Sequence, residues 1–373
     1  MAYDRRQLMA LCFTASLAPV TRLLPKLTAR IAGSASWLAP LCALPTLLVM
    51  LALLSGLMKM RREGEGLGEV ALRRAGRGVG TVALTIAAAF MVFNAGFILR
   101  TGAHRLISTI YPAAGPWVFV ISMLMLGTAA VLGPTKALPR AGRVFAPVLA
   151  AVMLLTLAFS LSSVDLRNLL PVRRNEAGML FIASLAVVEI YGGVLCAAAV
   201  LEHRAPLRSR RFCAYARWLL PIIALLTAFC TVIVGSYGAG LTAQFAHPFF
   251  SMIRDVTLLK TVERIEALVA ALWVLSDFAV FTLLLAAATH LLRLVLGFKP
   301  DGGDEPMLSM ANGRFIIPVC AVLALIVAAM SPSGAQSMDT ISYVVIPAMN
   351  LGICFVLIPL LLLTAKLRER KGR

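Results

Sequence analysis

About ten apolar stretches, most of them close to the length that crosses a bilayer, fill this chain from Gln7 to Leu363. A helix of about 20 apolar residues is about 30 Å long, which matches the hydrocarbon core of a membrane. Backbone inside lipid must satisfy its own hydrogen bonds, so such stretches become helices. The sequence therefore predicts an all-α integral membrane protein with about ten transmembrane helices. The stretches are 8–24, 37–58, 79–99, 116–132, 144–163, 179–201, 218–236, 267–296, 315–330 and 341–363.

The composition agrees with a single polytopic membrane domain. The chain is 60% hydrophobic and 14% charged, with a mean hydropathy of +0.89, whereas soluble proteins carry about 25% charged residues. A net charge of +18 would suggest nucleic acid in a soluble chain. Here the basic residues lie in short loops at the ends of apolar stretches, where they set topology and contact anionic lipid headgroups. We expect membrane lipid as a partner and no nucleic acid.

The distribution of Lys and Arg predicts the orientation of the chain. If both termini are cytoplasmic, most of the 35 Lys and Arg residues fall on the inner side, as the positive-inside rule requires. The outer loops then contain fewer basic residues, and Arg100 and Arg105 are predicted to lie in one of these loops. The Gly- and Arg-rich segment 59–78 predicts a mobile cytoplasmic connector, and the longer outer segment 237–264 predicts a short interfacial helix.

Glu189 is the most informative polar residue, because it lies ten residues into the sixth apolar stretch. An ionisable group at that depth costs about 2.5–3.5 kcal/mol or more and normally faces a cavity or a partner. Tyr191, Gly192 and Gly193 follow, and glycines weaken a helix. The pattern suggests a broken helix that exposes backbone groups at a ligand site. The alternative is a protonated Glu189 bonded to a neighbouring helix, with glycine for close packing.

Asp277 lies midway along the eighth stretch. Helical spacing places it on one stripe with Trp273 and Phe281, and this stripe is expected to face the bundle interior. Two readings remain open for its carboxylate. It holds a cation or a proton, or it pairs with a buried donor.

The first span also predicts an interruption. Ser16 and Pro19 lie at mid-depth, and proline removes a backbone donor and crowds the preceding turn. A tolerated kink is the alternative. Asn94 in the third span is a further candidate ligand contact, although Asn94 and Asn350 are also typical of hydrogen bonds between helices. Interrupted spans at positions one and six begin two halves, 1–176 and 177–373, and such paired breaks point to a midplane site of the transporter type.

The residues resemble a known family. The first span opens with Arg6-Gln7-Leu8, and residues 247–273 read HPFFSMIRDVTLLKTVERIEALVAALW. Together with ten spans and this length, the chain resembles the permease-like B subunit of nutrient germinant receptors from spores, a branch of the amino acid–polyamine–organocation transporter superfamily. The resemblance covers essentially the whole chain, and its most specific piece is the ERIEAL…W segment.

The resemblance implies inverted five-helix repeats with broken first and sixth helices. It also implies a role in sensing a germinant, often an amino acid, in the inner membrane of the spore, with A-type and C-type receptor subunits as partners. Relatives usually carry glycine in the first-span break, and this chain has none there, which predicts a smaller or different ligand or a subunit that only relays a conformational change. The ligand site carried over by resemblance comprises Ala15, Ser16, Ala18, Glu189, Tyr191 and Gly192, and the residue patterns add Pro19, Asn94 and Asp277.

Three functions follow from these features. The first is a receptor subunit whose conformational equilibrium is shifted by a small nutrient. The second is an amino-acid transporter coupled to protons or cations through Glu189 or Asp277, and the third is a scaffold without a ligand of its own. An enzyme is not expected, since the motifs H-E-x-x-H, G-x-S-x-G and C-x-x-C do not occur. We expect no metal and no cofactor, because the four histidines show no metal-ligand spacing.

Overall fold

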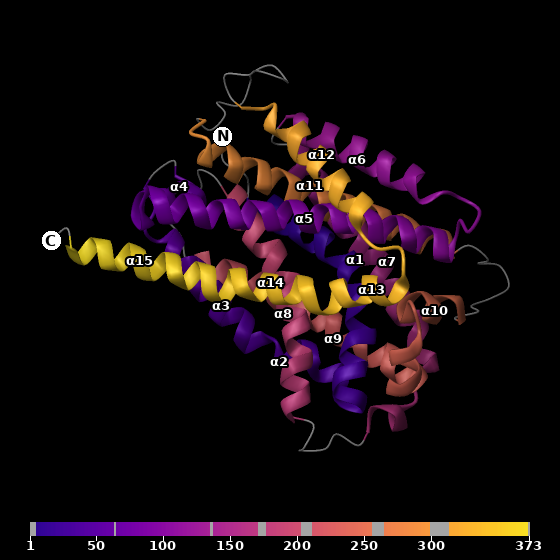
Figure 1. The fold of residues 1–373 in the computed structure, drawn as a ribbon. Helices are drawn as coiled ribbons and strands as arrows, with labels where there is room; N and C mark the ends of the chain where they lie inside the picture. The colour runs from indigo at the N-terminus through magenta and orange to yellow at the C-terminus, as the bar shows by residue number, and fades with distance from the viewer. Residues whose placement is uncertain are drawn as a thin grey trace.

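The computed structural model describes residues 5–62, 65–134, 137–170, 177–202, 211–255, 265–298 and 313–371. Within these ranges the side chains of 5–6, 18–23, 211–215, 255, 265–270, 335 and 369–371 lie outside the description. All regular elements of the described part are helical (Figure 1). They are α1 (Arg5–Ala32), η1 (Gly33–Leu38), α2 (Ala39–Cys42), α3 (Leu44–Met58), α4 (Leu67–Ala75), α5 (Arg77–Thr109), α6 (Pro116–Leu132), α7 (Ala137–Ser160), η2 (Leu161–Ser163), η3 (Leu166–Leu169), α8 (Ala177–Leu201), α9 (Arg211–Gln244), α10 (Pro248–Asp255), α11 (Ile265–Val295), α12 (Ile316–Met330), α13 (Ala335–Thr340), η6 (Ile341–Val345), α14 (Ile346–Gly352), η7 (Ile353–Leu357) and α15 (Ile358–Lys371).

The number of apolar helices confirms the predicted membrane fold. In the described part, 7 helical segments are long and apolar enough to cross a membrane. Three shorter apolar helices lie in α1, α6 and α12. Together they account for the ten apolar stretches of the sequence.

Two helices form the centre of the bundle. α1 packs against α7, α8, α9 and α11, while α5 packs against α6, α11 and α12 (Figure 1). The buried core follows these contacts, with Leu11 and Leu24 of α1 and Phe281 of α11 essentially inaccessible. Burial of such side chains fixes where the few polar groups of the interior meet.

The interruptions expected in the first and sixth spans are not found. α1 continues from Arg5 to Ala32 through Pro19, and α8 continues from Ala177 to Leu201 through both glycines. The glycines serve packing instead. A methyl group at Gly192 would lie 3.1 Å from Cys354 Sγ and 3.2 Å from Met50 Sδ. Small residues allow helices to approach this closely, so the prediction of broken helices at these positions was wrong.

Irregular backbone occurs in other spans. Within α9, Gly238 adopts a φ of 70°, which glycine tolerates at no steric cost and which kinks the helix. The last span contains two π-helical turns, η6 and η7, which end shortly before Pro347 and Pro359 respectively. Proline lacks the N–H of a regular helical turn and crowds the preceding carbonyl, so a wider turn before it relieves the clash.

The segment between the second and third spans is more ordered than its composition suggested. It contains α4, and Glu65 before that helix accepts hydrogen bonds from Arg73 Nε and Nη2, both at 2.6 Å. The backbone N–H of Gly66 donates to Glu69 Oε2 at 2.9 Å, which caps the helix start. These bonds oppose the expectation of a mobile connector, since they tie the two ends of α4 together. The helix expected within 237–264 is α10, while residues 256–264 lie outside the description.

Candidate functional site

A cavity with several polar groups lies between α5, α8, α11, η6 and α14, and two of the predicted site residues line it. Glu189 of α8 is only 8% exposed, and Asn350 of α14 donates a hydrogen bond from Nδ2 to Glu189 Oε1 at 2.9 Å. Asn94 of α5 lines the same space. The cavity measures about 40 Å³, which is room for a few water molecules. Its walls are Asn94, Phe97, Ile98, Glu189, Ile190, Gly193, Val194, Val280, Leu284, Ser342, Ile346 and Asn350.

Gly193 makes the contact between Glu189 and Asn350 sterically accessible. A methyl group at this position would lie 2.7 Å from Asn350 Oδ1 and 3.1 Å from its Nδ2, distances shorter than any ordinary contact with carbon. The second glycine of the predicted break therefore has a role at the site. It admits a polar side chain from the facing helix rather than breaking its own helix.

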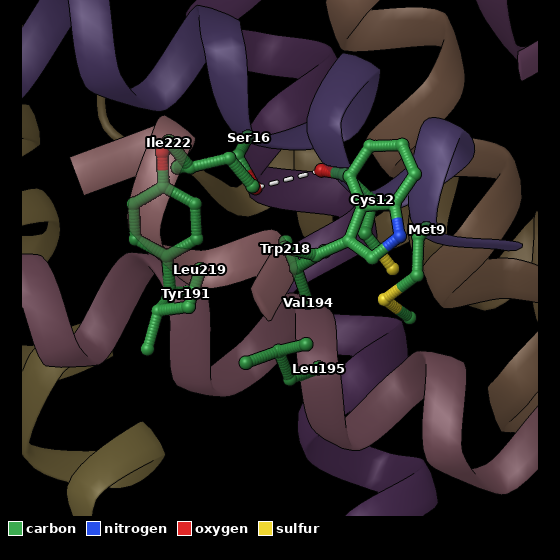
Figure 2. A pocket seen from close by; sticks show the side chains of 9 residues that line it. All are labelled: Met9, Cys12, Ser16, Tyr191, Val194, Leu195, Trp218, Leu219 and Ile222. Atoms are coloured by element: carbon green, nitrogen blue, oxygen red, sulfur yellow. Dashed lines mark hydrogen bonds between the residues drawn. The ribbon is translucent and has the colours of Figure 1, made fainter. Parts of the chain in front are cut away.

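A second, smaller cavity of about 20 Å³ lies between α1, α8 and α9 (Figure 2). Ser16 of α1 and Tyr191 of α8 line it together with Cys12 and Trp218. The Ser16 hydroxyl donates to the Cys12 carbonyl at 2.8 Å, so it is satisfied within its own helix. Val194 lines both cavities. This side chain of α8 thus contributes to the lining of both spaces.

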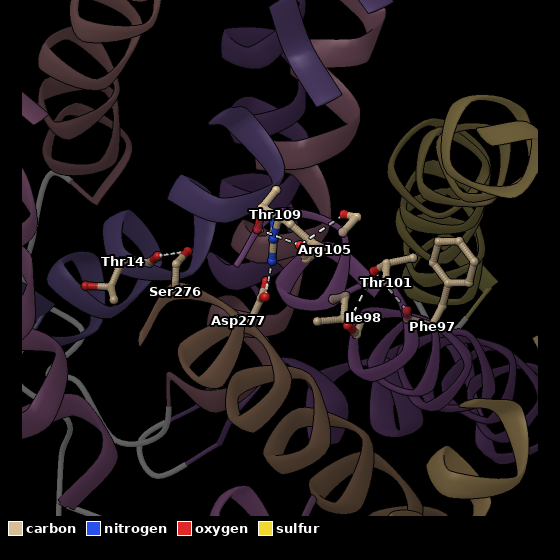
Figure 3. A network of polar contacts seen from close by, with 9 residues as sticks. Thr14, Phe97, Ile98, Thr101, Arg105, Thr109, Ser276 and Asp277 are labelled. Carbon is tan, nitrogen blue, oxygen red and sulfur yellow. Dashed lines mark hydrogen bonds and ion pairs between the residues drawn. The ribbon is translucent and has the colours of Figure 1, made fainter. Parts of the chain in front are cut away.

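Asp277 belongs to a different cluster, which is an ion pair (Figure 3). Its carboxylate pairs with the guanidinium of Arg105 from α5, and both residues are buried. The guanidinium carbon lies 4.8 Å from the centre of the Trp273 ring, within the range of a cation–π contact. Of the two readings left open for Asp277, the structure supports the buried donor.

Arg105 is the residue that sequence reasoning missed. It was assigned to an outer loop, yet it lies inside α5 and is 2% exposed. The adjacent Ser276 donates to the Thr14 carbonyl of α1 at 2.6 Å, which links α11 to α1 at the same level (Figure 3). Neighbouring residues of α11 therefore tie it to two other helices through polar contacts.

Among the remaining predicted residues whose side chains are described, Ala15, Gly192 and Asp277 do not line either cavity. Ala15 is fully buried in the core, and Gly192 packs against sulfur atoms of two other helices. The side chains of Ala18 and Pro19 lie outside the described part of the chain. The structure thus gathers Asn94 with Glu189, and Ser16 with Tyr191, and separates both pairs from Asp277.

Solved structures define the class of this fold. The chain is similar to Mhp1, a nucleobase-cation-symport-1 family transporter, in a closed conformation with bromovinylhydantoin bound. The TM-score is 0.64 at 16% identity, covering 95% of this chain and 76% of Mhp1. A substrate-bound, outward-open Na⁺-coupled sialic acid symporter gives a TM-score of 0.62 at 10% identity, covering 94% of this chain and 78% of the symporter. Inward-facing Mhp1 gives a TM-score of 0.55 at 15% identity, covering 99% of this chain and 78% of Mhp1. The architecture is that of a membrane transporter.

The family model described as spore germination protein matches residues 4–337, so the chain belongs to that family. This family is one of membrane proteins with a transporter fold and not a family of enzymes. No curated protein matches the chain. The family assignment confirms the resemblance found in the sequence.

Proposed function

We propose that this chain is the ligand-sensing membrane subunit of a germinant receptor, and that a small nutrient, such as an amino acid, occupies the cavity beside Glu189. One observation carries the proposal. A carboxylate and two carboxamides from three helices converge on one cavity inside a largely apolar bundle. Buried polar groups at membrane depth are costly and usually serve function. Family membership supports a role in spore germination.

The cavity is too small for an amino acid, so sensing requires expansion. Because α5, α8 and α14 each contribute a polar side chain, a ligand that separates them favours a different arrangement of the bundle. A ligand shifts such an equilibrium only by its difference in affinity for the two states. The new arrangement is passed to A-type and C-type receptor subunits. In this proposal both termini of the chain lie in the cytoplasm, and the chain consists of two halves, 1–176 and 177–373.

Glu189→Gln tests the proposal. The substitution keeps the size of the side chain and removes its charge, so we expect spores carrying it to need at least about tenfold more germinant for a half-maximal response. Arg62→Gln, an exposed loop change, is the matched control and is expected to respond as wild type. Equal responses of both variants would remove Glu189 from the site and favour a scaffold without a ligand.

Coupled amino-acid transport is the second candidate. The two symporters with this fold support it, and their structures are described as those of cation-coupled proteins. Asp277 already has the Arg105 guanidinium as its counter-ion, so of these two carboxylates Glu189, which lines a cavity, is the better candidate to bind a coupling proton or cation. Uptake of radiolabelled amino acids into proteoliposomes distinguishes the functions. Accumulation against a gradient supports a transporter, and saturable binding without accumulation supports a sensor.

A further inference from the structure

The lining of the cavity beside Glu189 has a marked chemical bias. Its polar atoms are the carboxylate of Glu189, the carboxamides of Asn94 and Asn350, and the hydroxyl of Ser342. All other side chains that line it are apolar, and no Lys, Arg or His is among the lining residues of the described part. The cavity thus presents one potential negative charge, several hydrogen-bond acceptors and no cation.

These groups match a ligand cation that donates several hydrogen bonds. An ionised carboxylate only accepts hydrogen bonds and offers about four lone-pair sites, so it can accept from a ligand donor in addition to Asn350. A primary ammonium has three N–H donors, and the amide oxygen of Asn94 and the hydroxyl of Ser342 are additional acceptors in the same lining.

A ligand carboxylate has no such match in this cavity. It would meet the Glu189 carboxylate, and the described lining residues include no cationic side chain. Like charges repel strongly where water is scarce. The two carboxamides offer N–H donors, but the Asn350 Nδ2 already donates to Glu189 at 2.9 Å. The nearby guanidinium of Arg105 is paired with Asp277 and lines neither cavity.

We infer that the cavity recognises the primary ammonium group of a small aliphatic ligand through Glu189, and that a carboxylate on the ligand contributes little to binding there. The apolar body lies against Phe97, Ile190 and Val280, which line the same space. The inference rests on the proposed function, since it specifies the ligand chemistry of the same site. It predicts that an amine without a carboxylate binds.

Three related compounds test this inference with the purified full-length chain in detergent. Valine carries both groups, isobutylamine lacks the carboxylate, and isovalerate lacks the amine. Calorimetric titration at pH 7 is expected to show binding of valine and isobutylamine within about tenfold of each other and at least about tenfold weaker binding of isovalerate. Glu189→Gln is expected to lower the affinity for isobutylamine at least about tenfold, and Glu189→Asp to recover part of it.

Matched variants keep the result interpretable. Arg62→Gln, an exposed change in the loop before α4, is expected to leave isobutylamine binding unchanged. If Glu189→Gln fails to fold, Asn94→Ala removes one acceptor while Glu189 remains, and a drop in amine affinity supports the same conclusion. Binding of isovalerate as tight as that of isobutylamine, or no binding of isobutylamine, overturns the inference. If valine still binds and Glu189→Gln spores still lose their response, the proposed function stands without it.

Discussion

The polar side chains of the interior differ in how readily the sequence revealed them. Glu189 stood out because it lies deep within an apolar stretch, whereas Asn94 was a weaker candidate, and the structure places both at one cavity. Asn350 was undervalued, since a lone amide in a span has the same appearance whether it joins helices or lines a site. Arg105 was misplaced because it follows the apolar run that ends at Leu99, whereas α5 continues to Thr109. In the sequence, an arginine just beyond an apolar run looks the same whether it lies in a loop or is buried against a partner from a distant helix.

Gly193 offers a test at the scale of one side chain. In Gly193→Ala the new methyl group would lie 2.7 Å from Asn350 Oδ1, so Asn350 must move away from Glu189. Losing a hydrogen bond to a charged group costs about 1.5–3 kcal/mol, and we expect germinant potency to fall about tenfold or more. Gly178→Ala on the same helix is the control, because nothing lies within 4 Å of that methyl group. Similar responses in both variants would contradict a role for the Glu189–Asn350 contact.

At the scale of elements, helix type was predictable and helix irregularity was not. Apolar length dictated where α-helices form, because lipid enforces backbone hydrogen bonding. Glycine and proline in a span, however, have two meanings, close packing or a break, and only the facing helix decides between them. Gly192 packs against Cys354 and Met50, whereas the π-helical turns occur before Pro347 and Pro359 of the last span.

A crosslink tests the packing of α8 on the last span. The thiols of Cys196 and Cys354 are 3.7 Å apart, and a disulfide needs about 2.05 Å. With diamide, an azo oxidant, each thiol loses one hydrogen, the S–S bond forms and the azo compound becomes a hydrazine. We expect mass spectrometry of a non-reducing digest to find the linked peptides. Cys320→Ser should keep the crosslink and Cys196→Ser should abolish it. Complete alkylation of both cysteines after denaturation would show that α8 and η7 are not in contact.

The junction before α4 gives a pH-dependent prediction. Hydrogen bonds from Arg73 lower the pKa of Glu65, with a further contribution from the backbone N–H of Arg62. Because the pKa of Glu65 is lower in the folded protein than in the unfolded chain, where it is about 4.3, the ionised carboxylate stabilises the fold at pH values above about 4.3. This stabilisation is lost as the pH falls through the pKa of Glu65 in the folded protein. We expect Glu65→Gln to weaken hydrogen-exchange protection of α4 by about 1 kcal/mol at pH 7. The difference from wild type should shrink below about pH 4, and a constant difference down to pH 2 would contradict the assignment.

For the whole molecule, the sequence indicated a transporter-like bundle but not which helices touch. Hydropathy is a property of each stretch alone, whereas the packing of α11 against α1 and α5 arises from contacts between residues more than a hundred positions apart. The ion pair between Arg105 and Asp277 is such a contact, since it joins α5 to α11. It connects the two predicted halves of the chain, 1–176 and 177–373.

Removing one partner of this ion pair leaves an uncompensated buried charge. We expect Arg105→Gln to lower the free energy of unfolding by about 3–5 kcal/mol, measured by denaturant titration of the purified protein. The double variant Arg105→Met, Asp277→Leu should recover most of the loss, because it replaces both charges with apolar groups of similar size. A single variant within about 1 kcal/mol of wild type would show that the pair contributes little to the fold.

Val194 contributes to the lining of both cavities. A smaller side chain at this position would remove carbon atoms from both linings at once and enlarge both spaces. If a nutrient binds beside Glu189 as proposed, Val194→Ala is therefore expected to admit a bulkier ligand while the carboxylate of Glu189 is unchanged. Ligand size could then be altered at a different position from ligand charge.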